Sequence, residues 1–132
     1  MAMTISAEHL GLAARNPTAL KDWYLRVLGA ELVFADGKTP PAYFVRVGAL
    51  LIEIYQSASW SEATADNRLS GWRHVALRVE AIESAQRELE SRGVHFDQEI
   101  KPAGGGGRIL FFKDGEDNLL HLVERPKETI FG

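Results

Sequence analysis

Two stretches of this chain follow the same pattern, and this repeat limits the possible folds more than any other feature. Each stretch begins with a histidine that opens an alternating run of apolar residues. It then continues into an amphipathic helical segment and ends at a glycine. The stretches are His9–Gly29 and His74–Gly93, and their lengths differ by one residue. Self-similarity of this kind indicates a structural unit that occurs twice.

The helix in each copy is bounded by recognisable end signals. In the first copy, Asn16 suits the N-cap, Pro17 suits the first helical position, and Gly29 suits the left-handed position after the last turn. The sequence therefore predicts a helix over residues 18–28. In the second copy the apolar spacing predicts a helix over residues 80–92, which is ended by Gly93.

Three short strands are predicted after each helix, separated by glycine, proline and aspartate turn signals. They cover residues 31–35, 42–48, 50–56, 95–101, 108–113 and 118–124. A sheet of parallel strands alternating with helices is the competing architecture, but only two helices accompany about eight strands. The connections are too short for crossovers, so the strands after each helix should pair antiparallel.

The predicted fold class is therefore α+β, with two βαβββ modules forming a curved, antiparallel-rich sheet trough and the helices on its convex face. Residues 1–132 are expected to form a single domain. Module one covers about residues 8–56, the polar linker covers residues 57–70, and module two covers about residues 71–124.

Side-chain alternation predicts that four metal-capable residues share the concave face. Apolar neighbours on each strand take the helix side, which turns the intervening residue to the other face. The four residues are His9, Glu53, His74 and His121. The repeat makes His9 equivalent to His74, and Glu53 equivalent to His121.

A lone strand histidine or glutamate is usually a surface residue, but here three of the chain's four histidines fall on repeat-matched positions with the same facing. A shared site explains this better than independent accidents. Three imidazoles and one carboxylate would hold one divalent metal ion, and they suit Zn, Ni, Co, Fe, Mn or Cu without choosing among them.

Four further residues are candidates for contact with a substrate. Arg46 and Arg78 could hold a carboxylate or phosphate, although exposed strand arginines are equally common. Tyr55 and Phe111 could form an apolar wall, but core or dimer packing explains aromatic residues as well. The run Gly104–Gly107 precedes a strand rather than a helix, so it is interpreted as a flexible loop and not as a phosphate-binding loop.

Composition excludes several classes of function. The net charge is −3 with scattered basic residues, so there is no basic field to attract nucleic acid or anionic lipid. There is no cysteine, which excludes a disulfide scaffold and thiolate metal sites. No signal-peptide pattern precedes His9, and no apolar stretch approaches the ~20 residues of a membrane span. A soluble, cytoplasmic protein is expected.

Four segments, "HLGLAARNPTALKDWYLRVLGAEL", "LLIEIYQ", "GWRHVALRVE" and "DGEDNLLHLVE", carry the repeat and the four candidate ligands. With them the chain resembles the vicinal oxygen chelate superfamily from about Glu8 to Glu124. That group includes glyoxalase I, methylmalonyl-CoA epimerase, extradiol dioxygenases, fosfomycin-resistance enzymes and bleomycin-binding proteins. The resemblance implies a metal-dependent enzyme acting on a small oxygenated metabolite, and it implies a homodimer.

The pattern of the superfamily matches at His9, Glu53 and His74 but departs at His121, where an acid is usual. In glyoxalase-type members that acid also transfers a proton, so the departure argues against a true glyoxalase I and against the extradiol and fosfomycin types. Glu53 is then the first candidate for a base and His121 the second.

The resemblance leaves three functions open. The first is isomerase or lyase chemistry, glyoxalase-like or epimerase-like, through a metal-stabilised enolate. The second is a non-catalytic, antibiotic-sequestering protein that uses an aromatic trough, and the third is a metal-dependent dioxygenase or hydrolase. The four ligand-type residues favour the first, because a sequestering protein has no need of them.

Overall fold

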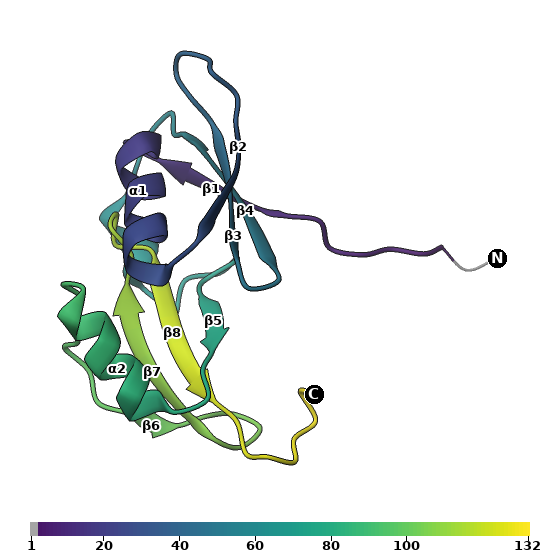
Figure 1. Ribbon diagram of the computed structural model, residues 1–132, viewed down its shortest axis with the longest axis vertical. Helices are drawn as coiled ribbons and strands as arrows, with labels where there is room; N and C mark the ends of the chain where they lie inside the picture. Colours follow the sequence, from purple (N-terminus) through teal and green to yellow (C-terminus); the bar gives the residue numbers. More distant parts are fainter. Residues whose placement is uncertain (1–2) are drawn as a thin grey trace. The chain divides into compact units, whose positions relative to one another are not determined.

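The computed structural model describes residues 3–132, which divide into two compact units with a boundary between Trp60 and Ser61 (Figure 1). Each unit contains one α-helix and one four-stranded mixed sheet. This confirms the predicted α+β class with two βαβββ modules. Among the described residues, neither helix is long and apolar enough to cross a bilayer.

Unit 1 has its sheet in the order β1-β4-β3-β2, in which β1 and β4 are parallel and the other neighbours are antiparallel. One helix, α1, packs against one face of this sheet (Figure 1). The elements are β1 (Leu10–Ala14), α1 (Pro17–Leu28), β2 (Glu31–Ala35), β3 (Tyr43–Val47) and β4 (Leu50–Gln56).

The ends of α1 are fixed by the predicted residues. The Asn16 side chain accepts a hydrogen bond from the Ala19 amide at 3.0 Å, and Pro17 occupies the first turn. Gly29 ends the helix in the left-handed conformation, with φ of 66°. Both ends of the helix could be predicted from the sequence, because an N-cap needs a short acceptor side chain and a left-handed residue after the last turn is usually glycine.

The core of unit 1 lies between α1 and the sheet. Leu20 and Tyr24 of the helix pack with Val45, Ile52 and Ile54 of the strands, and all five are at most 3% exposed. Burial of alternate residues of β4 on the helix side leaves the intervening side chains on the opposite face of the sheet.

Unit 2 repeats this arrangement, with its sheet in the order β5-β8-β7-β6 and its helix α2 packed against β7 and β8. Here β5 and β8 are parallel. The elements are the 3₁₀ helix η1 (Glu62–Ala65), β5 (Val75–Arg78), α2 (Ile82–Ser91), β6 (Lys101–Pro102), β7 (Arg108–Lys113) and β8 (Leu119–Glu124). Its buried centre is formed by the apolar residues Ile82, Leu89, Leu110, Phe112, Leu120 and Leu122.

Two predictions about unit 2 were wrong in detail. The strand predicted over residues 95–101 is reduced to Lys101–Pro102, because only these two residues have register partners on β7. The helix begins at Ile82 rather than at residue 80. Its N-cap, Ala81, has no capping side chain, and Glu124 caps the helix instead by accepting from the Ile82 amide at 2.8 Å.

Arg108 joins α2 to β8 through two carboxylates. Its guanidinium donates to Glu83 at 2.6 Å and to Glu124 at 2.9 Å. The hydrogen bonds from Arg108 lower the pKa of Glu83 to about 2, and the Ile82 amide together with Arg108 lowers the pKa of Glu124. Both carboxylates are therefore ionised at neutral pH.

This network predicts acid sensitivity. A carboxylate with a lowered pKa contributes stability that is present above its ordinary pKa of 4.5 and is lost as the pH falls towards 2. Glu83→Gln should therefore flatten the dependence of stability on pH between about 4.5 and 2, measured as urea midpoints at stepped pH. Glu90→Gln, on the same helix, should follow the wild type. Parallel curves for Glu83→Gln and the wild type would contradict the assignment.

Candidate functional site

The predicted pair of unit 1, His9 and Glu53, lies on the sheet face opposite α1. His9 stands two residues before Gly11, which is the register partner of Glu53. The distance from His9 Nε2 to Glu53 Oε1 is 3.6 Å, and each side chain is about one-third exposed. On the other side of Glu53 its partner is Phe44, whose ring meets the His9 ring edge-on with centroids 5.3 Å apart. The pair therefore has one aromatic wall and an open side.

The predicted pair of unit 2, His74 and His121, has the same construction. His74 stands two residues before Ala76, which is the register partner of His121. The two imidazole rings have centroids 4.7 Å apart. The partner of His121 on its other side is Phe111, which contacts both histidine rings edge-on, at 5.7 Å from His74 and 4.9 Å from His121. The strand register thus reproduces the residue equivalences expected from the repeat.

All three histidines of these pairs have the same ring nitrogen engaged. In each one, Nδ1 faces an oxygen that can only accept a hydrogen bond. The acceptors are the Glu8 carboxylate for His9 at 2.9 Å, the Asn67 amide oxygen for His74 at 2.8 Å and the Leu122 carbonyl for His121 at 3.1 Å. Nδ1 must then carry the hydrogen, which leaves the lone pair of a neutral ring on Nε2. This arrangement is typical of histidines that bind a metal through Nε2.

His121 is the most enclosed of the four residues, with only 6% of its surface exposed. Burial lowers its pKa, and the positive charges of Arg125 and Lys101 act in the same direction, against the opposing effect of the Leu122 hydrogen bond. The imidazole is therefore neutral at pH 7. Neutral imidazole is the form that binds a metal ion.

The two substrate-contact candidates in unit 1 share the face of Glu53. The Tyr55 ring lies over Gly11, where an added Cβ would be 3.4 Å from its Cε1 atom. Arg46 is 44% exposed, and its guanidinium lies 3.9 Å from the Glu31 carboxylate. A contact that long between exposed groups holds Arg46 only weakly.

The two candidates in unit 2 have different surroundings. Phe111 is buried and forms the wall between the histidine pair and Lys101, whose ammonium lies 4.9 Å above the ring. Arg78 is exposed and contacts the end of the chain, where its Nη1 donates to the Gly132 oxygen at 2.8 Å. The Gly104–Gly107 run forms a turn before β7, as predicted, and Arg125 Nη1 donates to two of its carbonyl oxygens.

Several residues of these clusters were missed by sequence reasoning. Phe44 could have been found, because the repeat makes it equivalent to Phe111. Glu8 and Asn67 could not, because each lies outside the predicted strands and the repeat gives no equivalent for it. Among residues 3–132, neither unit by itself brings together three side chains of the metal-ligating types in a group that could hold an ion.

Comparison with known proteins gives the family. The model of the Glyoxalase/Bleomycin resistance protein/Dioxygenase superfamily matches residues 6–122, which include both histidine-led modules. The chain belongs to this superfamily. None of the curated proteins matches it.

Solved structures share the fold of this superfamily member at low sequence identity. A glyoxalase family protein from Enterococcus faecalis is 24% identical with a TM-score of 0.77, covering 90% of this chain and 97% of that one. A protein described as a glyoxylase/bleomycin resistance protein/dioxygenase domain, from Frankia sp. EAN1pec, is 21% identical with a TM-score of 0.72, covering 95% of each chain. A mutant of the fosfomycin resistance protein FosX from Listeria monocytogenes, complexed with Mn(II) and 1S,2S-dihydroxypropylphosphonic acid, is 18% identical. Its TM-score is 0.70, and the match covers 96% of this chain and 94% of that one.

Proposed function

We propose that this protein is a divalent-metal-dependent enzyme that acts on a small oxygenated metabolite. The observation that carries the proposal is the shared state of the three histidines, whose Nδ1 atoms are all hydrogen-bonded to oxygen and whose Nε2 lone pairs are free to bind a metal. The proposed ligands are His9 and Glu53 from unit 1 with His74 and His121 from unit 2.

The donor set fits a borderline divalent ion. Three imidazole nitrogens and one carboxylate oxygen suit Zn, Ni, Co, Fe or Mn, and a six-coordinate ion would keep two positions for oxygens of the substrate. When bound, such an ion would supply Lewis-acid stabilisation of negative charge on a carbonyl or hydroxy-carbonyl oxygen. The reactions that need this are isomerisations and lyase reactions in which a proton next to a carbonyl is removed.

Glu53 is the proposed base for that proton. Its carboxylate is one-third exposed, so a substrate can reach it, and His9 Nε2 lies 3.6 Å from one of its oxygens. His121 is the second candidate, because its lowered pKa keeps the ring unprotonated and able to accept a proton at neutral pH. Phe44 and Phe111, one beside each pair, would keep water away from the reacting group.

The comparisons are consistent with this proposal. FosX, a structural neighbour, was crystallised with Mn(II) and a small oxygenated molecule. By resemblance to the superfamily, we infer a cytoplasmic homodimer. The competing function is a sequestering protein that binds a small molecule without metal chemistry, and metal content separates the two.

The test is the metal content of the purified protein and of two histidine variants. We expect about one divalent ion per chain after reconstitution and dialysis. His74→Ala should lose at least ~100-fold in affinity for zinc, since even the outer-shell partners of a metal site are worth 10–100-fold. His95→Ala is the matched control, because His95 lies outside both pairs. Elemental analysis and calorimetric zinc titration measure both quantities.

Two results would count against the proposal. A wild-type protein that takes up no metal after reconstitution would favour the sequestering function. Equal losses in His74→Ala and His95→Ala would show that zinc binds to histidines in general and not to the proposed site.

A further inference from the structure

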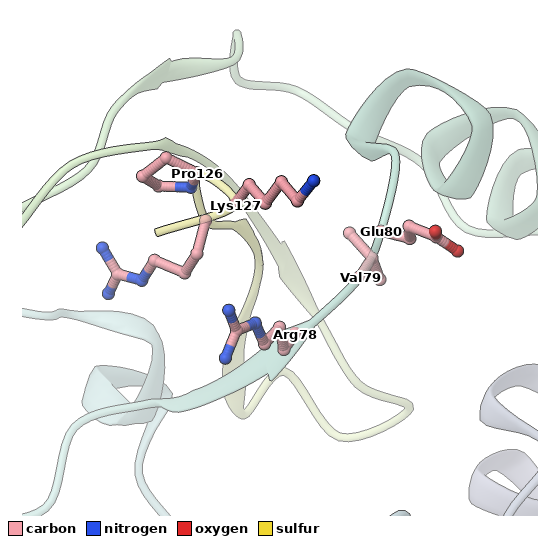
Figure 2. A pocket seen from close by; sticks show the side chains of 6 residues that line it. Arg78, Val79, Glu80, Pro126 and Lys127 are labelled. Atoms are coloured by element: carbon pink, nitrogen blue, oxygen red, sulfur yellow. The ribbon is translucent and has the colours of Figure 1, made fainter. Parts of the chain in front are cut away.

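Unit 2 contains a pocket of about 380 Å³ at the C-terminal ends of β5 and β8 (Figure 2). Its lining comes from the end of β5 and from the segment that follows β8. The residues are Arg78, Val79, Glu80, Arg125, Pro126 and Lys127. Three of the six are cations, and one is an acid.

The pocket lies on the same sheet surface as the histidine pair of unit 2. Alternation places Arg78, the last residue of β5, on the face of His74, which lies directly before that strand. Arg125 directly follows β8 and lies four positions after His121, so the same alternation puts it on the face of His121. The two strands are parallel, with Arg78 opposite Val123, so both arginines are at the same end. Each arginine lies four positions after its histidine along extended backbone, a distance of about 13 Å.

In the described part of the chain, no aspartate or glutamate side chain neutralises the positive charge of the pocket, although Arg78 donates to an oxygen of the terminal residue, Gly132. Within residues 3–132, Arg78, Arg125 and Lys127 form no ion pair with an aspartate or glutamate side chain. Glu80 lines the pocket, but Figure 2 shows its carboxylate directed away from the Arg78 guanidinium. The pocket therefore keeps a net positive charge that an anionic group could neutralise.

Both guanidiniums already bind oxygen, and each does so through a single nitrogen. Arg78 Nη1 donates to the Gly132 oxygen at 2.8 Å, and Arg125 Nη1 donates to the Gly104 and Gly106 carbonyls at 2.6 and 2.7 Å. A guanidinium has five N–H donors. Nε and Nη2 of both arginines consequently have no acceptor among the described residues. The two side chains are held in place by the protein and retain donors for a ligand.

We propose that this pocket binds the phosphate group of an extended substrate whose oxygenated end reaches His74 and His121. This inference rests on the proposed function and names its substrate class, a phosphate ester or phosphonate. Two planar guanidiniums match the charge and the several oxygens of a phosphate better than a single carboxylate. Figure 2 shows the Lys127 ammonium directed away from the Arg78 guanidinium, so Lys127 contributes charge to the lining and not a third converging donor. The separation of about 13 Å requires the phosphate to be remote from the reacting group.

The test is binding of inorganic phosphate to the full chain, followed by calorimetry or by chemical shifts at constant ionic strength, with acetate as the comparison anion. We expect phosphate to bind more tightly than acetate. Arg78→Gln should weaken phosphate binding by at least ~10-fold, the value of a lost charged hydrogen bond. Arg87→Gln removes one positive charge from α2 instead and should leave the affinity for phosphate unchanged. Lys127→Gln should weaken phosphate binding by about 3-fold, because a lysine ammonium is a point charge and lacks the two-pronged donor geometry of a guanidinium. This variant provides the test if Arg78→Gln does not fold.

The histidine variant separates this inference from the proposed function. His74→Ala should lose zinc and keep its affinity for phosphate, whereas Arg78→Gln should do the opposite. Equal phosphate affinity in Arg78→Gln and Arg87→Gln would overturn the inference. So would phosphate binding that requires zinc and disappears in His74→Ala, because the anion would then be at the metal. A failure of the wild type to bind zinc would overturn the proposed function and leave the phosphate measurement as an independent result.

Discussion

Gly107→Ala is expected to lower the free energy of unfolding by about 3–5 kcal/mol, from backbone strain and overpacking together. Gly107 has φ of +100°, a conformation that side chains other than glycine rarely adopt. A Cβ there would overlap the Glu124 carbonyl oxygen and approach the Arg125 Cα to 3.2 Å. Neither backbone can move aside easily, because Arg108 and Glu124 are register partners in the sheet and the Gly107 carbonyl accepts from the Ala103 amide.

Gly104→Ala is the matched control for that variant. Gly104 belongs to the same glycine run, but an added Cβ would meet no atom within 4 Å, and its φ lies outside the left-handed region. Its substitution should change stability by less than ~1 kcal/mol. Urea unfolding followed by circular dichroism measures both variants. Equal stabilities would show that the β7–β8 junction is less rigid than its hydrogen bonds indicate.

The repeat and the alternation of side chains were enough to predict the modules and the two residue pairs. His9 lies beside Glu53, and His74 lies beside His121. Each of these two histidines directly precedes a strand whose apolar residues face a helix, and burial on that side sets the face of the neighbouring residues. The turn residues and the alternation of apolar side chains predict local structure well here because backbone propensity and tertiary packing favour the same conformation.

The hydrogen bonds that orient the histidine rings could not be predicted from the sequence. Asn67 lies in the connector between the modules, where no periodicity constrains a side chain, yet its amide oxygen fixes the His74 ring. Arg78 was a candidate for holding an anion, but Arg125 was missed, because it follows the last predicted strand and its position depends on the path of the glycine turn. Both depend on loop geometry, which is set by tertiary contacts and not by residue pattern.

Leu110→Ala is expected to cost about 3 kcal/mol of stability, within the 2–5 kcal/mol range for large-to-small core substitutions. Leu110 is fully buried at the centre of unit 2, opposite Leu122 in the register and on the side that faces α2, where Ile82 is also fully buried. Removal of its side chain leaves a cavity whose walls belong to two strands and a helix. Such walls collapse only partly, so both the transfer free energy and the packing contacts are lost.

The same substitution at an exposed leucine isolates this effect. Leu69 is 43% exposed in the same unit, and Leu69→Ala should change the free energy of unfolding by less than ~0.5 kcal/mol. Because Leu110 and Phe111 point to opposite faces of β7, folded Leu110→Ala should bind zinc as the wild type does, while its urea midpoint falls. A loss of zinc affinity in the folded variant would show that the two faces are coupled, and that the helix-side packing holds His121 in position. A stability equal to that of Leu69→Ala would contradict the assignment of Leu110 to the core.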